Sequence, residues 1–186
     1  MKTNSTVLVA TLLAAALTGC GKVSDKVGDK AAEKIAEAAL SKDGTKVKID
    51  TAANGVTITS TDSNGAKVSM EMGNAKVTEA DLGLPLYPGA VVPSSGGSNR
   101  TTSAQGSVVV ASFESKDSMD KVAAFYRAKL QAMAGAKSIA DIKVEDAMML
   151  GFEDDASKQA LQLTFNKTDS GGTVFSITHS VPNPKP

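Results

Sequence analysis

Apolar and polar residues alternate along three successive runs between residues 46 and 78. The apolar positions are Val47 and Ile49, then Val56 and Ile58, then Val68, Met70 and Met72. This period of two is that of a β-strand with one buried face. Asn54-Gly55 and the 62–65 segment separate the runs with residues that tolerate positive φ. The pattern predicts a three-stranded β-meander.

A helix is predicted just before the meander, over residues 23–41. Its apolar positions recur every four residues, at Val23, Val27, Ala31, Ile35 and Ala39, with charged residues on the other faces. Three strands with a single apolar face need a cover to be stable. We expect this helix to be that cover, or else a stalk near a membrane.

The second half of the chain has the strongest helical period, over residues 118–134. Its apolar side is formed by Met119, Val122, Ala123, Tyr126, Leu130 and Met133, and Asp117 is the expected cap. Tyr126 lies in the middle of that side and should be buried, whereas Lys121 and Lys129 should be solvated. Around the helix, strands are predicted at 107–113, 147–153, 159–166 and 172–181.

Pro, Ser, Gly, Asn and Thr dominate residues 93–106, which predicts a mobile loop. The expected fold class is therefore α+β: one main helix packed on an antiparallel or mixed sheet, preceded by a helix and a three-stranded β-meander. The expected divisions are a signal peptide (1–19), an anchor and helix (20–44), the meander (45–80), an α+β domain (81–181) and a tail (182–186).

The N-terminus has the composition of a secretory signal. Lys2 precedes an apolar run from Val7 to Leu17, which as a helix would span roughly half of the ~30 Å hydrocarbon core of a bilayer. The next residues, Leu17-Thr18-Gly19-Cys20, resemble the lipobox of bacterial lipoproteins. That resemblance implies lipid on the Cys20 thiol, cleavage before Cys20 and acylation of the new amine, commonly with palmitate. Gly21 in place of Asp favours the outer membrane, facing the periplasm. The alternatives are an ordinary signal peptide or a buried cysteine.

Charge and composition exclude several classes of protein. There are 20 basic and 20 acidic residues, without a polybasic block, and the aromatics are five Phe and two Tyr without Trp. A nucleic-acid partner is therefore not expected. Cys20 is the single cysteine, which excludes an intrachain disulfide and a cysteine zinc cluster.

Candidate chemistry is sparse. His179 is the single histidine, and on an apolar strand face it is expected to be a polar cap at the edge of the core. The acidic pairs near Glu145-Asp146 and Glu153-Asp155 could hold calcium but match no calcium loop, and are expected to be solvated. Copper at Met70 and Met72 or at Met148-Met149 is the weaker alternative to core packing. We expect no metal and no cofactor.

The most plausible contact region for a ligand is Tyr87-Pro88-Gly89 beside the 93–106 loop, which includes Arg100. The alternative is a structural turn entering the sheet.

Residues 84–181 resemble small bacterial lipoproteins and exported domains of no known activity. The features that carry the resemblance are Tyr87-Pro88-Gly89-Ala90, a strand ending near Glu114-Ser118, and a helix with Val122, Phe125, Tyr126 and Leu130. The aromatic that usually follows the helix is absent, since Ala136-Lys137 comes after Gly135. The resemblance implies one helix against a sheet.

The function expected from these features is that of a lipid-anchored envelope protein acting as a non-enzymatic binding or interaction module. The alternative is a hydrolase or glycan-modifying enzyme of the envelope, which should bury at least two carboxyl groups of raised pKa in one cleft. A third class, a structural tether, predicts affinity for peptidoglycan.

Overall fold

The computed structural model describes residues 26–42, 44–52, 55–73, 75–94, 97–134 and 139–183. The signal peptide and Cys20 lie outside this part of the chain. Three helices and nine strands follow one another along the described residues: α1 (Lys26–Leu40), β1 (Lys46–Ala52), β2 (Gly55–Thr61), β3 (Lys67–Gly73), α2 (Glu79–Leu82), β4 (Ser98–Ser103), β5 (Gly106–Ser115), α3 (Met119–Ala134), β6 (Ala140–Val144), β7 (Ala147–Asp154), β8 (Gln159–Lys167) and β9 (Thr173–Pro182).

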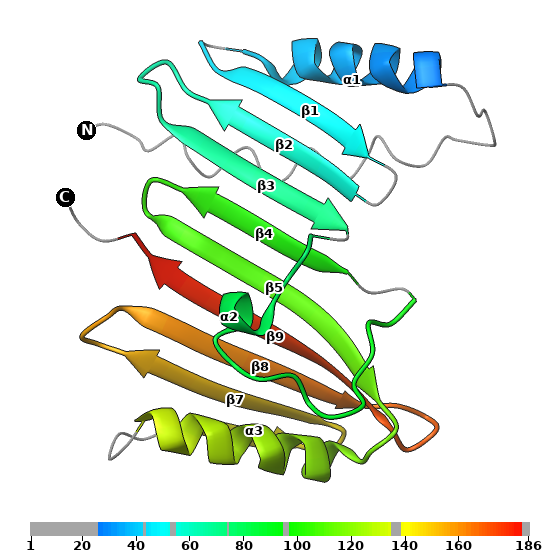
Figure 1. The fold of residues 1–186 in the computed structure, drawn as a ribbon, viewed down its shortest axis with the longest axis vertical. Coiled ribbons are helices and arrows are strands. Elements are labelled where there is room, and N and C mark those ends of the chain that lie inside the picture. The colour runs from blue at the N-terminus through cyan, green and yellow to red at the C-terminus, as the bar shows by residue number, and fades with distance from the viewer. Residues whose placement is uncertain are drawn as a thin grey trace.

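All nine strands form one antiparallel sheet in the order β1-β2-β3-β4-β5-β9-β8-β7-β6 (Figure 1). The expected fold class is therefore wrong: the described residues form a nine-stranded antiparallel sheet with few helices, and the meander is not a separate layer. It forms the first three strands of a sheet that continues through the expected division near residue 81.

The strand that joins the two halves is β4, in the segment that we expected to be a mobile loop. β4 pairs with β5 along its whole length and with β3 through Ser69–Glu71. Its sequence, Ser-Asn-Arg-Thr-Thr-Ser, contains no apolar residue. Backbone hydrogen bonds to a neighbour on each side hold it, so hydrophobic periodicity could not reveal it.

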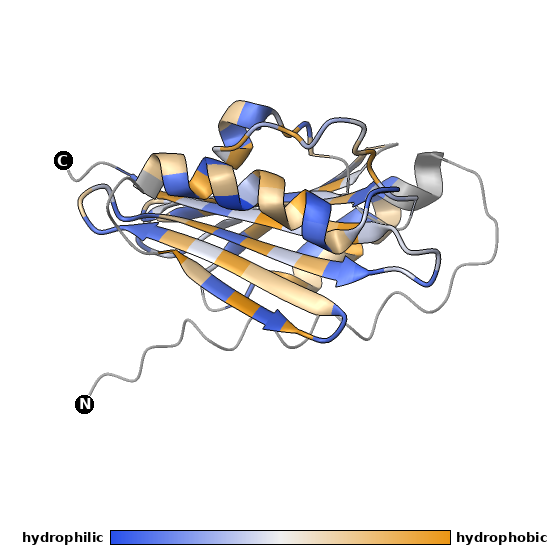
Figure 2. Ribbon diagram, turned by 90° about the horizontal axis from the view of Figure 1, so that it is seen from below, coloured by the Kyte–Doolittle hydropathy of each residue, from blue (hydrophilic) through white to orange (hydrophobic). Residues whose placement is uncertain are grey.

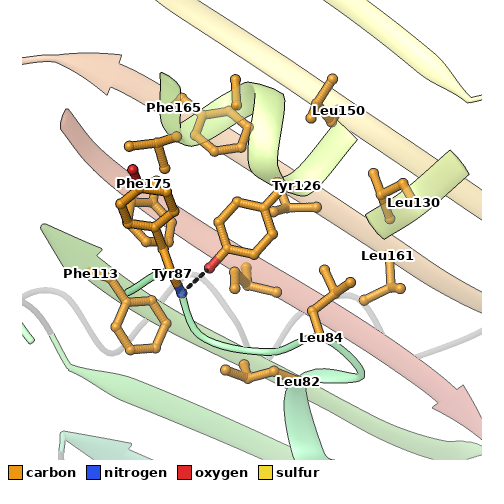
Figure 3. Packing of buried hydrophobic residues seen from close by; sticks show 14 of the residues in the cluster. Leu82, Leu84, Tyr87, Phe113, Tyr126, Leu130, Leu150, Leu161, Phe165 and Phe175 are labelled. Carbon is orange, nitrogen blue, oxygen red and sulfur yellow. Dashed lines mark hydrogen bonds between the residues drawn. The ribbon is translucent and has the colours of Figure 1, made fainter. Parts of the chain in front are cut away.

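Two helical elements cover one face of the sheet, which we call the helix face (Figure 2). α3 packs on β7 and β8, and α2 packs on β5 and β9. Between them and the sheet lies a core in which Tyr126, Phe165, Phe175, Leu163 and Ile177 are at most 1% exposed (Figure 3).

α3 confirms most of the helix expected at 118–134. The Ser118 carbonyl accepts from the N–H groups of Lys121 and Val122, and Tyr126 is fully buried. Met133 is wrongly placed in the apolar side, being 47% exposed at the last turn. Asp117 lies one residue before Ser118, and its carboxylate accepts from the Tyr87 hydroxyl and from the Lys121 ammonium.

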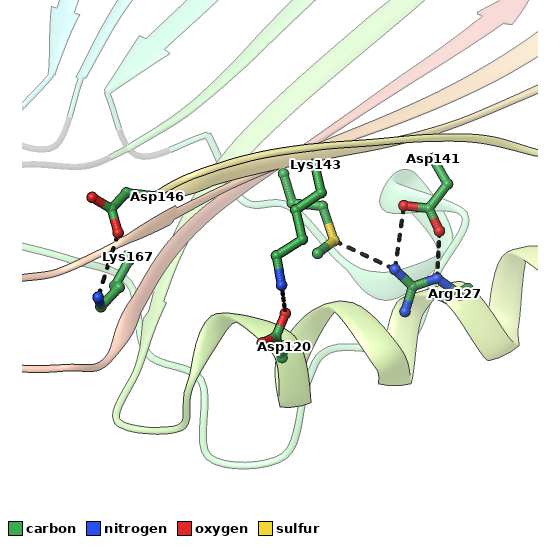
Figure 4. A network of polar contacts seen from close by, with 7 residues as sticks. Asp120, Arg127, Asp141, Lys143, Asp146 and Lys167 are labelled. Carbon is green, nitrogen blue, oxygen red and sulfur yellow. Dashed lines mark hydrogen bonds and ion pairs between the residues drawn. The ribbon is translucent and has the colours of Figure 1, made fainter.

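β6 is a strand that the sequence pattern did not predict, because all five of its residues are exposed. It is an edge strand paired with β7 alone. Two ion pairs tie it to α3: Arg127 Nε to Asp141 Oδ2 at 2.6 Å and Lys143 Nζ to Asp120 Oδ1 at 2.5 Å (Figure 4).

α1 lies along the edge of β1, but with a different side toward the sheet than we expected. The Glu37 and Glu33 carboxylates accept from the edge N–H groups of Ile49 (2.6 Å) and Thr51 (2.8 Å). Within the described part of the predicted apolar stripe, Ala31, Ile35 and Ala39 are exposed, Ile35 at 71%. Carboxylates that satisfy an open strand edge fix the helix more effectively than an alanine-rich stripe could.

The apolar side of the sheet changes between its two halves. One row across the helix face runs through Phe152, Leu161, His179 and Val109 and then continues as Arg100, Glu71, Thr57 and Asp50. The apolar residues of β1–β3 therefore point to the opposite side, which we call the open face. Their exposure follows, with Val68 at 40% and Met70 at 37%.

Candidate functional site

The structure divides the contact region expected at Tyr87, Pro88, Gly89 and Arg100. Tyr87 is buried; its N–H donates to the Tyr126 hydroxyl (3.0 Å) and its own hydroxyl donates to Asp117 Oδ2 (2.7 Å). The bond to Asp117 raises the pKa of the Tyr87 phenol. Pro88 and Gly89 form an exposed turn in which Gly89 has a φ of 78°. Tyr87 is therefore part of the core rather than a contact residue, as the structural alternative held.

Arg100 belongs to a polar cluster beneath α2 that also contains Asp81 and His179. Its Nη2 lies 2.9 Å from Asp81 Oδ1 and donates to the Lys76 carbonyl oxygen (3.3 Å). Nε is buried and has no hydrogen-bond partner among the described residues. The capping box of α2 explains why Asp81 is placed here: the Thr78 N–H donates to Asp81 Oδ2 (2.8 Å), and the Asp81 N–H donates to the Thr78 hydroxyl (3.3 Å).

His179 completes this cluster from β9. Its Nδ1 lies 2.8 Å from the Asp81 carbonyl oxygen, and because a carbonyl can only accept, Nδ1 carries a proton. The ring is 8% exposed and lies beneath Gly83, whose φ is 65°. His179 is thus at the edge of the core and holds α2 to the sheet, in line with the polar cap expected for it.

The acidic groups with shifted pKa are the opposite of what the enzyme alternative predicted. Hydrogen bonds from Thr78, and then the Arg100 charge, lower the pKa of Asp81. Lys121 and Tyr87 lower that of Asp117, and Arg127 lowers that of Asp141. Each carboxylate is stabilised in its charged form by a donor.

The side chains considered as metal ligands do not come together in the described part of the structure. The part of the chain that the structure describes contains no cluster of three or more His, Cys, Asp or Glu side chains able to hold a metal ion. Asp146 and Asp155 pair with Lys167 and Lys158. Met70 and Met72 on β3 are separated from Met148 and Met149 on β7 by β4, β5, β9 and β8, so the two methionine pairs do not meet.

Two shallow depressions lie on the helix face, on either side of the segment that leads from β3 to α2. The first has a volume of about 250 Å³ and is lined by Ala75, Lys76, Val77, Val92, Gly97, Ser98, Ala111, Ser112 and Phe113. The second, of about 310 Å³, shares Ala75 and Lys76 and extends over β2 and β3 to Glu71. Ligand sites typically measure ~300–1,000 Å³, so each suits a small ligand or part of a larger one.

The first depression combines an apolar wall with a single charge. Phe113, Val77 and Val92 supply the wall, and among the described lining residues Lys76 is the charged one. Gly97 lets the chain before β4 pass close to the end of β3, because a Cβ there would lie 2.2 Å from the Gly73 carbonyl oxygen. This site could not be found from the sequence, since its residues come from three separate segments without a shared motif.

Comparison with known proteins agrees with a binding role. Residues 94–174, less than half of the chain, are similar to the family described as START domain-like. The matched stretch runs from just before β4 to the start of β9 and includes α3. Domains of this kind typically bind ligands rather than catalyse reactions. No curated protein and no solved structure matched the chain.

Proposed function

We propose that this chain is a lipid-anchored protein of the bacterial envelope that binds a small ligand without chemically changing it. The observation that carries the binding role is the first depression, an apolar hollow with one lysine at the rim of the START-like segment. An apolar wall and one cation suit a ligand with an apolar body and a single negative charge.

The depression is too small to enclose a long chain. At about 250 Å³ it falls below the usual range for a drug-sized ligand, so a short aliphatic or aromatic acid would fill it. The Lys76 ammonium would pair with the acid group while the body of the ligand contacts Phe113 and Val77. Glu71 in the second depression would repel the same acid, which directs the ligand to the first.

Octanoate is a suitable probe, and octylammonium, which reverses the charge, is its control. We expect calorimetric titration of the full chain to show binding of octanoate and weaker binding of octylammonium. Lys76→Glu should reduce octanoate affinity by about tenfold or more, the loss of roughly one charge-assisted contact. Lys67→Glu, on β3 outside the lining of either depression, should leave it unchanged. Equal binding of both probes would remove the role of Lys76.

The lipid anchor is supported by Leu17-Thr18-Gly19-Cys20 behind the short apolar run. No helix among the residues that the structure describes is long and apolar enough to cross a membrane. Several acyl chains at ~0.8 kcal/mol per buried methylene would hold the protein stably on its bilayer. Gly21 supports the outer membrane as the destination.

Intact mass of the protein purified from membranes tests the anchor. We expect a chain that begins at Cys20 and carries acyl groups, while Cys20→Ala should stay uncleaved at this site and without lipid. In an enterobacterial host, Gly21→Asp should move the protein from the outer to the inner membrane in a density gradient. A wild-type chain cut elsewhere, without an acyl increment, would refute the anchor.

A further inference from the structure

The open face of β1–β5 is a mostly apolar surface, and its charged neighbours lie at the margin: Lys158 lines a hollow beside Thr101 and Val108. Its central row crosses five strands and consists of Ile49, Ile58, Met70, Thr101 and Val108, which are direct cross-strand partners. The neighbouring rows add Val47, Val56, Val68, Met72 and Val110. On this face of the five strands the charged side chain is Glu114, at the far end of β5.

We propose that the open face is where two copies of this chain associate, sheet against sheet. This goes beyond the proposed ligand binding and does not depend on it, because the depressions lie on the helix face.

Exposure and area both support an interface. Val68, Met70 and Val108 are 37–40% exposed, an unusual state for three apolar side chains in one patch. Five strands ~4.8 Å apart, each with about six residues of ~3.4 Å rise, give roughly 500 Å² per copy. Two copies together would bury roughly 1,000 Å², which reaches the lower limit for a specific interface.

The chemistry of the face favours a second copy over a bilayer. A symmetric pair brings identical patches together, and a patch without charge in its centre causes no like-charge repulsion. A membrane-binding surface would need basic and large aromatic residues, and the rows named above contain neither. Lys46, Lys48 and Lys67 project from the other face of the same strands.

Two copies could instead associate by pairing their β1 edge strands, but that edge of the sheet is already covered. α1 occupies it, because Ser41, Glu37 and Glu33 accept from the edge N–H groups of Val47, Ile49 and Thr51. Face-to-face packing of twisted sheets at about −30° is the remaining arrangement. A two-fold axis in the plane of the interface and perpendicular to the strands would place both α1 helices at the same end, as two anchors in one membrane require.

Cross-linking tests the face directly. Met70 lies at the centre of the patch, and Ser69, one residue earlier, points to the opposite side. In the full chain, Met70→Cys should form a covalent dimer of twice the monomer mass on oxidation in cells. Ser69→Cys should dimerise no more than the wild type, which carries Cys20 alone. Dimer yield that is equal for the two variants, or a Met70→Cys adduct whose mass is not twice the monomer, would overturn the proposal.

Sedimentation of the full chain in density-matched detergent provides a second readout. The wild type and Ser69→Glu should sediment as dimers, and Met70→Glu as a monomer with an unchanged circular dichroism spectrum. Mixing Met70→Glu with Met70→Lys should restore the dimer. Two results would overturn the proposal that a second copy covers this face. One is a monomeric wild type, and the other is access of lipid-dissolved quenchers to position 70 in phosphatidylglycerol vesicles.

Discussion

Replacing Tyr126 with Ala would remove the side chain on which the core between α3 and the sheet depends. The ring is fully buried, with centroids 5.0 Å from Phe125, 5.6 Å from Phe175 and 6.1 Å from Phe165. Truncating a buried aromatic costs about 3–5 kcal/mol. The hydroxyl also accepts the Tyr87 N–H, and leaving a buried donor unpaired costs about 1–3 kcal/mol more.

The expected loss of about 4–8 kcal/mol is comparable with the ~5–15 kcal/mol that stabilises a domain. Tyr126→Ala should therefore be largely unfolded, whereas Tyr126→Phe should lose only the acceptor, about 1–3 kcal/mol. Lys129→Ala is the matched surface change on the same helix, since its ammonium lies 5.4 Å from the Phe125 ring centroid and is exposed. It should cost less than about 1 kcal/mol.

Urea denaturation followed by circular dichroism measures all three variants. The free energy of unfolding should fall in the order Lys129→Ala, Tyr126→Phe, Tyr126→Ala. If Tyr126→Ala kept the wild-type midpoint, α3 would not be held by this core, and the account of the fold would be refuted.

Three further changes are predicted from the same structure. Burial raises the pKa of Tyr126 to about 12. The stability that the protonated phenol contributes is therefore complete below the unfolded pKa near 10 and is lost as pH rises toward 12. Over that range the urea midpoint of the wild type should fall by the equivalent of about 2–3 kcal/mol, and that of Tyr126→Phe should fall less. Gly83→Ala should cost about 1–3 kcal/mol in thermal denaturation, because a Cβ at φ 65° would lie 2.9 Å from His179 Cε1, whereas Gly89→Ala, at φ 78° with no atom within 4 Å, should cost about 1 kcal/mol. Replacing residues 98–103 with a Gly-Ser linker should reduce amide-exchange protection at the β3 N–H groups that face β4, while those that face β2 keep theirs; unchanged protection on the β4 side would mean that β4 is not needed.

The sequence predicted the elements in which apolar residues keep a period. β1–β3 and α3 were found because their apolar residues alternate or recur every three to four residues. β4 and β6 were missed because ladder hydrogen bonds and ion pairs, rather than burial, hold them. Alternation shows which residues of a strand share a face, but not which side of the sheet that face joins. Nothing in Val68-Met70-Met72 could show that they point away from Phe113 and Phe175.

The candidate site shows the same limit. Tyr87 was singled out as a possible ligand contact beside a loop, but its partners Tyr126 and Asp117 are 39 and 30 residues away, and they hold it in the core. Arg100 forms an ion pair with Asp81 in α2. Nothing in the sequence around Asp81 indicates that Arg100 is its partner. Lys76, Ser98 and Phe113 come together only once the segment before α2 crosses β4 and β5.

Amide chemical-shift mapping of the isotopically labelled full chain in detergent, titrated with octanoate, shows whether a ligand binds in the first depression. We predict saturating shifts at Lys76, Val77, Gly97 and Ser98, around the first depression, and none at Val68, Met70 or Val108 on the open face. Shifts confined to the open face, or an absence of saturable shifts, would contradict the proposed site.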